Sequence, residues 1–312
     1  PLKQIVSELP NYHPYAPFKG KAFQLEIGRG CDHGCRFCMV SKLLRKGRFR
    51  SYKKLLEILL QGMRETNVNI VDVYGTNLSD FPKLTELCWD IVNQGYEISL
   101  ATLRPDKVNQ ELLEALYKGG QRSITIAIET GTERLRKVIG KPIRDEKIYG
   151  AIKMISESKI PSLKNFFLIG LPTETNHDRE ALVNMVIEEH KILSKGDIKK
   201  PLLKVDVNPF IPKWQTPFKN YLYNFLPEHR IEFANTILEI YLKFDSMPGI
   251  KPKQTPLSYS LAQTWITHLK TPINYILNKI PLKNHVYSTI NAPFFLYRFK
   301  DQLDEILNKQ WE

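Results

Sequence analysis

Three cysteines, Cys31, Cys35 and Cys38, lie within one short stretch of the chain. Thiolates are soft ligands that suit iron–sulfur clusters and zinc. A closed structural zinc site needs four ligands, usually as two separated pairs, and the only other cysteine is Cys88. His33 could supply a fourth ligand, but it lies inside the same loop, and four ligands from one short loop surround a single ion with difficulty. The spacing therefore favours a four-iron cluster held by three thiolates, with one iron open to a small ligand.

The loop around these cysteines is rich in glycine. Gly28, Gly30 and Gly34 let the backbone turn tightly around a cluster. Backbone N–H groups of such a loop can also hydrogen-bond cluster sulfurs. Four cysteines in 312 residues do not make a disulfide scaffold, so we expect a reducing, cytoplasmic location. Cys88 lies in a helical pattern beside Trp89, and we interpret it as a buried structural thiol.

The composition is that of a soluble globular protein, with 42% hydrophobic and 25% charged residues. No stretch approaches the roughly 20 apolar residues that span a bilayer, so no membrane partner is expected. The net charge of +12 indicates a lysine-rich surface or an anionic partner such as nucleic acid. The surface interpretation is favoured because basic residues are spread along the chain, the densest run being 42–54. The chain begins with Pro1 and not Met, which suggests an excerpt of a longer protein or a processed chain.

Strand-like segments alternate with helical patterns along the chain. The predicted strands are 22–28, 69–74, 97–101, 124–129, 164–169 and 203–208. The predicted helices between and after them are 51–65, 80–94, 107–117, 132–139, 144–158 and 176–194. Repeated β–α order implies parallel strands with right-handed crossovers.

Six such units are too few for a closed eight-stranded barrel. The predicted fold is therefore α/β, a partial (β/α)6 barrel of the TIM type or a wound sheet, over residues 21–227. Residues 1–20 are predicted to be a lead-in or linker, because prolines cluster there. Residues 228–312 are predicted to form a mainly helical C-terminal extension.

The predicted strands alternate apolar and polar residues, whereas strands buried on both faces read as unbroken apolar runs. The apolar face suits packing against helices, so the polar face, including Glu129, is predicted to point inward. Buried charge is costly unless it is paired, so we predict an internal network of Lys204 with Asp206 or Glu26. A ligand that needs a polar interior is the favoured explanation, and a sheet with one wet face is the alternative.

These motifs together resemble the radical S-adenosylmethionine (SAM) superfamily. Its signature is CxxxCxxC with an aromatic residue before the last cysteine, after the first strand of a β–α series. The wider string LEIGRGCDHGCRFC is similar to a subgroup that often carries a cobalamin-binding domain. The further stretches that match this subgroup, in order, are SLATLRPD at 99–106, IAIETGTERLRKVIGKPI at 126–143, FFLIGLPTET at 166–175 and NPFIPKWQTPF at 208–218.

The resemblance implies that Cys31, Cys35 and Cys38 bind a [4Fe–4S] cluster whose open iron is chelated by the amine and carboxylate of SAM. Reductive cleavage of SAM would give a 5′-deoxyadenosyl radical that takes hydrogen from a substrate or serves cobalamin-linked methyl transfer. A small electron donor such as flavodoxin or ferredoxin is implied. No DxHxxG cobalamin motif occurs here, so a cobalamin domain, if used, lies outside these residues.

The resemblance also implies contacts to SAM. Phe37 would lie beside the adenine through its backbone. Gly75 and Thr76 stand where the family usually has a Gly-Gly-Glu-like segment, and the acidic residue is absent here. Glu129 would reach the ribose or amine of SAM, unless it is a plain helix-start carboxylate. The other implied or candidate contacts are Gly170 and Leu171 at the adenine-side turn, and Arg104 and Arg144 for the carboxylate.

Two other functions stay open from the sequence. One is an RNA-modifying protein similar to methylthiotransferases, in which the basic run contacts phosphate. The other is a non-catalytic iron–sulfur electron carrier, which would normally have four cysteine ligands and a small fold. The sequence predicts neither the substrate, the reaction subclass, the catalytic residues nor the oligomeric state.

Overall fold

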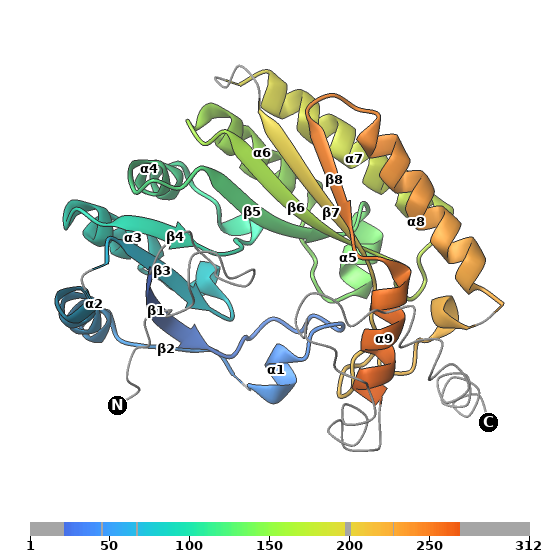
Figure 1. Cartoon of the computed structure of the whole chain (residues 1–312), viewed down its shortest axis with the longest axis horizontal. Coiled ribbons are helices and arrows are strands. Elements are labelled where there is room, and N and C mark those ends of the chain that lie inside the picture. Colours follow the sequence, from blue (N-terminus) through green and yellow to red (C-terminus); the bar gives the residue numbers. More distant parts are fainter. Residues whose placement is uncertain (1–21, 45, 67, 197–200, 227, 269–312) are drawn as a thin grey trace, which may run out of the picture.

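The computed structural model describes residues 22–44, 46–66, 68–196, 201–226 and 228–268. The predicted lead-in, 1–20, and the part of the predicted extension after residue 268 lie outside the described residues. Within them, strands and helices alternate along the chain (Figure 1). No helix in these ranges is long and apolar enough to cross a membrane.

The described strands form two four-stranded sheets, in the orders β2-β1-β3-β4 and β5-β6-β7-β8. The first sheet contains β1 (Ala22–Arg29), β2 (Arg48–Phe49), β3 (Ile70–Gly75) and β4 (Glu97–Leu100). The second contains β5 (Ser123–Glu129), β6 (Ser162–Ile169), β7 (Leu202–Pro209) and β8 (Ile250–Gln254). Neighbouring strands are parallel except β2, which is antiparallel to β1. A parallel bridge between Leu103 and Ile126 joins the two sheets.

The longer helices follow the strands of each β–α unit. They are α2 (Tyr52–Thr66), α3 (Leu84–Asn93), α4 (Gln110–Lys118), α6 (Asp145–Glu157), α7 (Asn176–Ser194) and α8 (Arg230–Asp245). These helices lie along the outer side of the curved row of strands (Figure 1). The remaining elements are α1 (Val40–Leu43), α5 (Glu133–Val138), α9 (Leu257–His268) and the short 3-10 turns Leu78–Asp80, Pro105–Lys107 and Tyr223–Phe225.

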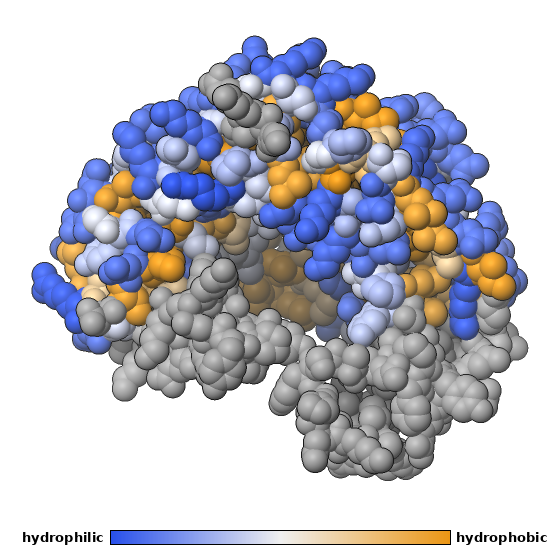
Figure 2. Space-filling model, turned by 45° about the horizontal axis from the view of Figure 1, so that its top comes forward, coloured by the Kyte–Doolittle hydropathy of each residue, from blue (hydrophilic) through white to orange (hydrophobic). Residues whose placement is uncertain are grey.

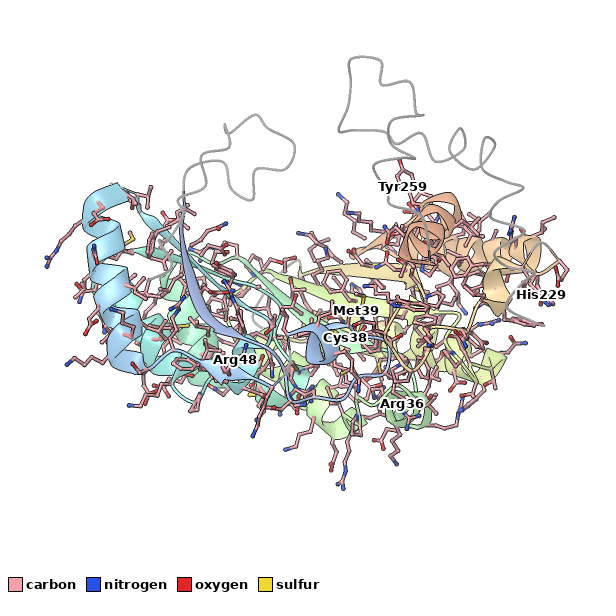
Figure 3. All side chains as sticks on the ribbon, turned by 90° about the horizontal axis from the view of Figure 1, so that it is seen from below. Arg36, Cys38, Met39, Arg48, His229 and Tyr259 are labelled. Carbon is pink, nitrogen blue, oxygen red and sulfur yellow. The ribbon has the colours of Figure 1, made fainter. Side chains whose placement is uncertain are left out.

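Hydrophilic residues predominate on the outer surface, with smaller hydrophobic patches between them (Figure 2). The opposite side carries the segment that holds the cysteines. Cys38 and Met39 lie there beside α1, with Arg36 and Arg48 in the same view (Figure 3). The carboxyl ends of the parallel strands point to this side, which is the edge where sites of α/β proteins form.

The structure confirms the predicted parallel β–α order, and all six predicted strands match within about two residues at each end. The curved row of strands is consistent with a partial barrel. One finding differs from the prediction, because β8 adds a further parallel strand beside β7, inside the region predicted to be mainly helical. Its sequence, IKPKQ, has no apolar alternation, and it contains Pro252, which an edge strand tolerates.

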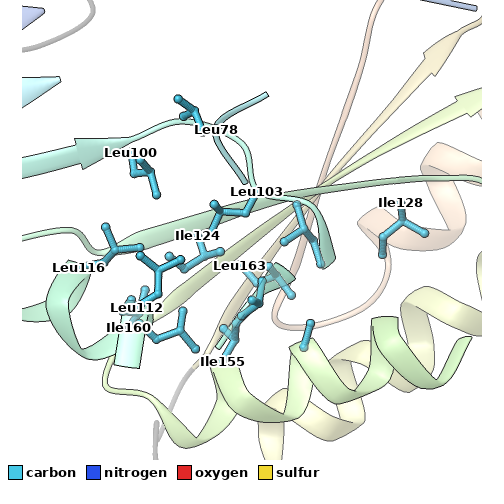
Figure 4. Close-up of a cluster of buried hydrophobic side chains, with 14 of the residues drawn as sticks. Leu78, Leu100, Leu103, Leu112, Leu116, Ile124, Ile128, Ile155, Ile160 and Leu163 are labelled. Atoms are coloured by element: carbon cyan, nitrogen blue, oxygen red, sulfur yellow. The ribbon is translucent and has the colours of Figure 1, made fainter. Parts of the chain in front are cut away.

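The hydrophobic core lies between the strands and the outer helices. The apolar face of β5, with Ile124, Ile126 and Ile128, is almost completely buried there. Leu112 and Leu116 of α4 belong to the same buried cluster (Figure 4). Burying each such side chain contributes roughly 1.5–3 kcal/mol, which fixes this face of β5 toward the helices. The other face must therefore point inward, as the alternation predicts.

The inward face carries the predicted charged network, with different partners. Asp206 on β7 is buried, and its Oδ2 lies 2.8 Å from Lys164 Nζ on β6. Glu26 on β1 pairs with Arg29 and with Arg50. The prediction that Lys204 pairs with Asp206 was wrong. The cation that pairs with Asp206 is Lys164 of the neighbouring strand, and the register between β6 and β7 brings the two side chains together.

A buried carboxyl lies on the opposite, helix-facing side of the second sheet. Glu189 of α7 is fully buried and accepts a hydrogen bond from Asn165 Nδ2 on β6. Burial raises the pKa of Glu189 to about 8. An unfolded glutamate titrates near ~4.3, so the fold favours the protonated carboxyl. The stability that this proton contributes is complete below about pH 4 and is lost as the pH rises through about 8.

We therefore expect the free energy of unfolding to fall by about 2–3 kcal/mol between about pH 6 and pH 9, and to fall much less in Glu189→Gln. Urea unfolding of both proteins at the two pH values measures this. Glu188→Gln removes a charge from the neighbouring, partly exposed position and should behave like the wild-type chain. An equal pH-dependent fall in Glu189→Gln would contradict the assignment.

Candidate active site

The segment that holds the three cysteines follows β1 directly, and hydrogen bonds from two other elements fix it. Thr76 Oγ1, just after β3, donates to Gly30 O at 2.5 Å. Arg36 N donates to Ile139 O, at the end of α5, at 2.8 Å. The loop is therefore tied to both sheets.

A close backbone approach adds to this support. Gly140 has a φ of 73°, and a Cβ at this position would lie 2.6 Å from Gly34 O in the cysteine loop. Only glycine meets both conditions without strain. On the other side of the loop, His33 Nε2 lies 2.7 Å from Asp80 Oδ2. His33, considered above as a zinc ligand, therefore contacts a carboxylate of the neighbouring turn.

The three cysteines carry free, partly buried thiols. Burial raises the pKa of Cys31 and of Cys35, while the positive charge of Arg104 opposes both shifts. The thiolate is the ligand form, so binding of metal has to drive the loss of these protons. Cys88 is fully buried, and burial raises the pKa of its thiol to about 12, which fits the structural role predicted for it.

The donor set fits an iron–sulfur cluster. In the described ranges, no three His, Cys, Asp or Glu side chains are grouped so that they could hold one metal ion. Three thiols that each ligate a different iron of a cube need not converge on a single point. Cys38 Sγ also accepts a hydrogen bond from Val40 N at 3.5 Å, the type of backbone contact that tunes ligating sulfurs.

A cavity of about 490 Å³ lies beside the cysteine loop, on the inward face of the second sheet. Phe37 of the loop and Glu129 at the end of β5 both line it, so two of the predicted cofactor contacts lie in one wall. The remainder of the wall comes mainly from β6, β7, β8 and α9. It includes aromatic rings and some of the polar side chains predicted to face inward, Asp206 among them, but neither Glu26 nor Lys204.

Glu129 is held in an unusual conformation at this wall. Its φ is 77°, and a non-glycine residue in the left-handed region often marks a functional position. Its Oε1 accepts from Lys141 Nζ at 2.8 Å, and Lys141 also donates to Ala127 O at 2.6 Å. Both side chains of the pair are at most 10% exposed. The pair neutralises a buried charge at the end of the strand.

The turn that supplies Lys141 is anchored by a buried arginine. Arg136 of α5 has no exposed surface, and its guanidinium donates to Thr130 O at 2.8 Å and to Ile143 O at 2.7 Å. It also pairs with Asp145 at the start of α6. The planar, five-donor head of arginine suits such a multiple contact. Glu129 and Lys141 are therefore presented by a rigid segment.

The sequence profile of the Radical SAM superfamily matches residues 25–186, which include the cysteine loop, Glu129 and Lys141. This chain belongs to the radical SAM superfamily. The signature cysteines of the superfamily are those on the loop that lies beside the cavity.

Three known proteins illustrate its relationships. The chain is 33% identical over 241 residues to the uncharacterized protein MJ0966 of Methanocaldococcus jannaschii, covering 77% of this chain and 52% of that protein. It is 27% identical over 176 residues to the ribosomal protein uS12 methylthiotransferase RimO of Clostridioides difficile, covering 53% and 39%. The chain thus spans about half or less of these curated relatives.

The fold is similar to that of a solved radical SAM protein. The structure of the methyltransferase TsrM from Kitasatospora setae, with cobalamin and a [4Fe–4S] cluster bound, matches with a TM-score of 0.51 and 12% identity. The match covers 92% of this chain and 60% of that chain. At this identity the similarity concerns the fold alone.

The structure does not bring the other implied SAM contacts into the cavity wall. Gly75 lies against Gly28, where a Cβ would be 2.9 Å from Gly28 O, and Thr76 holds the loop through Gly30. Both residues therefore contact the backbone that leads into the cysteine loop. Their direct contact with SAM stays a prediction.

Gly170 and Leu171 form a tight turn after β6. Their N–H groups donate to Glu174 Oε2 at 2.8 and 3.2 Å. Leu171 belongs to a small buried cluster against which Phe37 packs, so the turn supports the cysteine loop through this apolar contact. The predicted adenine-side role of this turn is not tested by these contacts.

The two candidate arginines for the SAM carboxylate lie in different settings. Arg104 is partly buried and forms a two-pronged pair with Asp106, with both distances at 3.1 Å. Arg144 is exposed at the start of α6. Arg104 is close enough to the cysteines to influence their pKa, whereas nothing places Arg144 at the cavity.

Sequence reasoning gave no site role to Lys141, nor to Lys213, Lys253 and Ser260, which line the cavity. The unpaired inward carboxylate at Glu129 was a signal that a cation had to lie near by. No spacing rule connects a strand to a turn after the next helix, so the partner could not be named. The cavity residues from β8 and α9 fall in a region without any motif.

Proposed function

We propose that the chain binds a [4Fe–4S] cluster through Cys31, Cys35 and Cys38, binds SAM beside it, and cleaves SAM reductively to act on a substrate in the adjacent cavity. The observation that carries this proposal is the position of three free thiols on a loop held by both sheets, beside a cavity lined by aromatic, polar and charged side chains. When bound, the cluster and SAM supply reductive cleavage of the sulfonium C–S bond, giving the 5′-deoxyadenosyl radical.

The chain's own residues then position and shield the reacting groups. Glu129, fixed by Lys141, is placed to accept a hydrogen bond from the ribose or amine of SAM. Phe37 forms the wall between the loop and the cavity, and the rings of Phe166 and Phe210 help to exclude water. We propose that the six parallel units, over residues 21–227, form a partial barrel that carries this site on its inner face, and that β8 and α9 complete the cavity.

An external electron donor such as flavodoxin or ferredoxin is part of the proposal. Arg36, Lys42, Lys46 and Arg48 are exposed on or just after the cysteine loop. Such a surface attracts an acidic partner, and its association should weaken as salt is added. This also offers an explanation for part of the net positive charge, without nucleic acid.

The reaction subclass divides into methyl transfer and other radical reactions. Cobalamin-linked methyl transfer is supported by the fold shared with TsrM, a methyltransferase solved with cobalamin bound. We propose that any cobalamin domain lies outside these residues, since the match to this chain covers only about half or less of each relative. A methylthiotransferase-like reaction is supported by the similarity to RimO, which is named for ribosomal protein uS12.

Product analysis tests the proposal. The anaerobically reconstituted chain is incubated with SAM and dithionite, with omission of dithionite as the control, and products are measured by mass spectrometry. We expect reductant-dependent 5′-deoxyadenosine, and S-adenosylhomocysteine as well where methyl transfer operates. Adding cobalamin to a longer protein that includes the flanking residues should then increase S-adenosylhomocysteine. If the chain forms neither 5′-deoxyadenosine nor S-adenosylhomocysteine, whichever reductant is used, the proposal is contradicted.

A further inference from the structure

The end of the cavity that lies farther along the second sheet is built by β7, β8 and α9. Asp206 and Lys253 are directly opposite each other in the parallel register of β7 and β8. Ser260 and Gln263, one turn apart on α9, line the same cavity, as does Lys213 after β7. This end is therefore a polar wall assembled from elements that come after residues 25–186, the range that the superfamily profile matches.

The carboxylates of the cavity are already neutralised. Glu129 pairs with Lys141 at 2.8 Å, and Asp206 pairs with Lys164 at 2.8 Å. Both carboxylates are at least nine-tenths buried, and Lys141 is buried with Glu129, whereas Lys164 is partly exposed. Neither one is left to balance a further positive charge.

Two lysines of the wall have no such partner. Among the described residues, neither Lys213 Nζ nor Lys253 Nζ is paired with a carboxylate, and both residues line the cavity while remaining exposed to solvent. The wall thus holds two positive charges in excess. Burial of a ligand beside them would strengthen their attraction for an anion, because the effective dielectric falls when water leaves.

A buried hydroxyl points to the same conclusion. Ser260 has no exposed surface, and its Oγ has no hydrogen-bond partner among the described residues. A buried polar atom without a partner costs free energy, so such atoms usually serve a ligand or an ordered water. A hydroxyl can donate to an anionic oxygen.

We propose that the substrate presents an anionic group, a carboxylate or a phosphate, to Lys213, Lys253 and Ser260 at this end of the cavity. The inference rests on the proposed function, because it assigns the substrate to the cavity beside the cysteines. The rings of Phe37, Phe166 and Phe210 also line the cavity. The remainder of the substrate is therefore partly apolar, which orients the anionic end away from the cluster.

A set of matched probes tests the charge requirement. Phenyl phosphate, phenylacetate, phenylacetamide and phenethylamine share one ring and differ in charge. Their dissociation constants are measured by saturation-transfer NMR with the reconstituted wild-type chain. We expect at least one anion to bind about five- to tenfold more tightly than the amide, with the amine weaker still. The ratio between the two anions distinguishes phosphate from carboxylate.

Variants locate the binding. Lys213→Gln and Lys253→Gln should each weaken binding of the preferred anion about five- to tenfold and leave binding of the amide unchanged. Ser260→Ala should weaken binding of the preferred anion as well. Lys53→Gln removes the same charge from an exposed position on α2 and should change nothing. The inference would be overturned if the anions and the amide bound equally well. It would also be overturned if Lys53→Gln weakened anion binding as much as Lys213→Gln and Lys253→Gln.

Competition with SAM separates this inference from the proposed function. Saturating phenyl phosphate or phenylacetate should leave the dissociation constant of SAM unchanged in the wild-type chain. Competition between probe and SAM would overturn the inference, because the lysines would then bind the carboxylate of SAM itself. If SAM is cleaved reductively but the anions show no preference, the inference fails and the proposed function stands. If SAM is not cleaved, the proposed function fails whatever the probes show.

Discussion

Replacing Cys35 with alanine should abolish reductive cleavage of SAM, while replacing Cys88 with alanine should leave it near the wild-type level. Cys35 lies on the loop beside the cavity, and its loss leaves two thiolates for a cluster that needs three. Cys88 lies on the buried face of α3, is not among the residues that line the cavity, and carries a thiol that burial keeps protonated. Each variant removes one cysteine sulfur, so a difference between them reports the position of the thiol and not the type of substitution.

The measurement is reductant-dependent 5′-deoxyadenosine per chain, with iron content determined on the same samples. Cys31→Ala and Cys38→Ala should match Cys35→Ala, with iron far below that of Cys88→Ala. Full iron content and activity in Cys35→Ala would show that another residue ligates the cluster. Loss of activity in Cys88→Ala with normal folding would show that the thiol has a role that the structure does not suggest.

Replacing Lys141 with methionine should both destabilise the chain and weaken SAM binding. It leaves the buried carboxylate of Glu129 without its partner, and breaking a buried pair from one side typically costs about 3–5 kcal/mol. It also frees Glu129 from the orientation in which we place it against SAM. We expect the unfolding free energy to fall by about 3 kcal/mol and the dissociation constant of SAM to rise about tenfold or more.

A second substitution separates the two effects. Adding Glu129→Gln to Lys141→Met removes the unpaired charge, so stability should largely return while SAM binding stays weak. Lys137→Met, on the exposed side of α5, is the matched control and should change neither quantity. Wild-type SAM affinity in the double variant would contradict the role proposed for Glu129. Urea unfolding and SAM titration of the four proteins provide both measurements.

The sequence predicts the parallel β–α order and the inward polar face because both depend on local periodicity. In β5, isoleucine at every second position can be buried only if that face packs against helices, and this places Glu129 on the inner face. The cysteine loop could also be predicted from the sequence, because three ligands close together in sequence must be close in space. These features need no knowledge of which strand lies beside which.

The features that the sequence could not predict depend on register and on distant chain segments. Asp206 pairs with Lys164 and not Lys204, because the neighbouring strand supplies the cation. Glu129 pairs with Lys141, which a turn beyond α5 brings back to the end of β5. The edge strand β8 has lysines and a proline where a strand pattern would have apolar residues, so only its pairing with β7 reveals it.

The central claim is that three thiolates hold a four-iron cluster with one iron left for SAM. The most direct test is electron paramagnetic resonance of the anaerobically reconstituted, dithionite-reduced chain before and after addition of SAM, with metal analysis of the same sample. We expect about four iron atoms per chain, a reduced-cluster signal, and a clear change in that signal when SAM binds the open iron. A chain that loads zinc, or a cluster signal that SAM leaves unchanged, would contradict it.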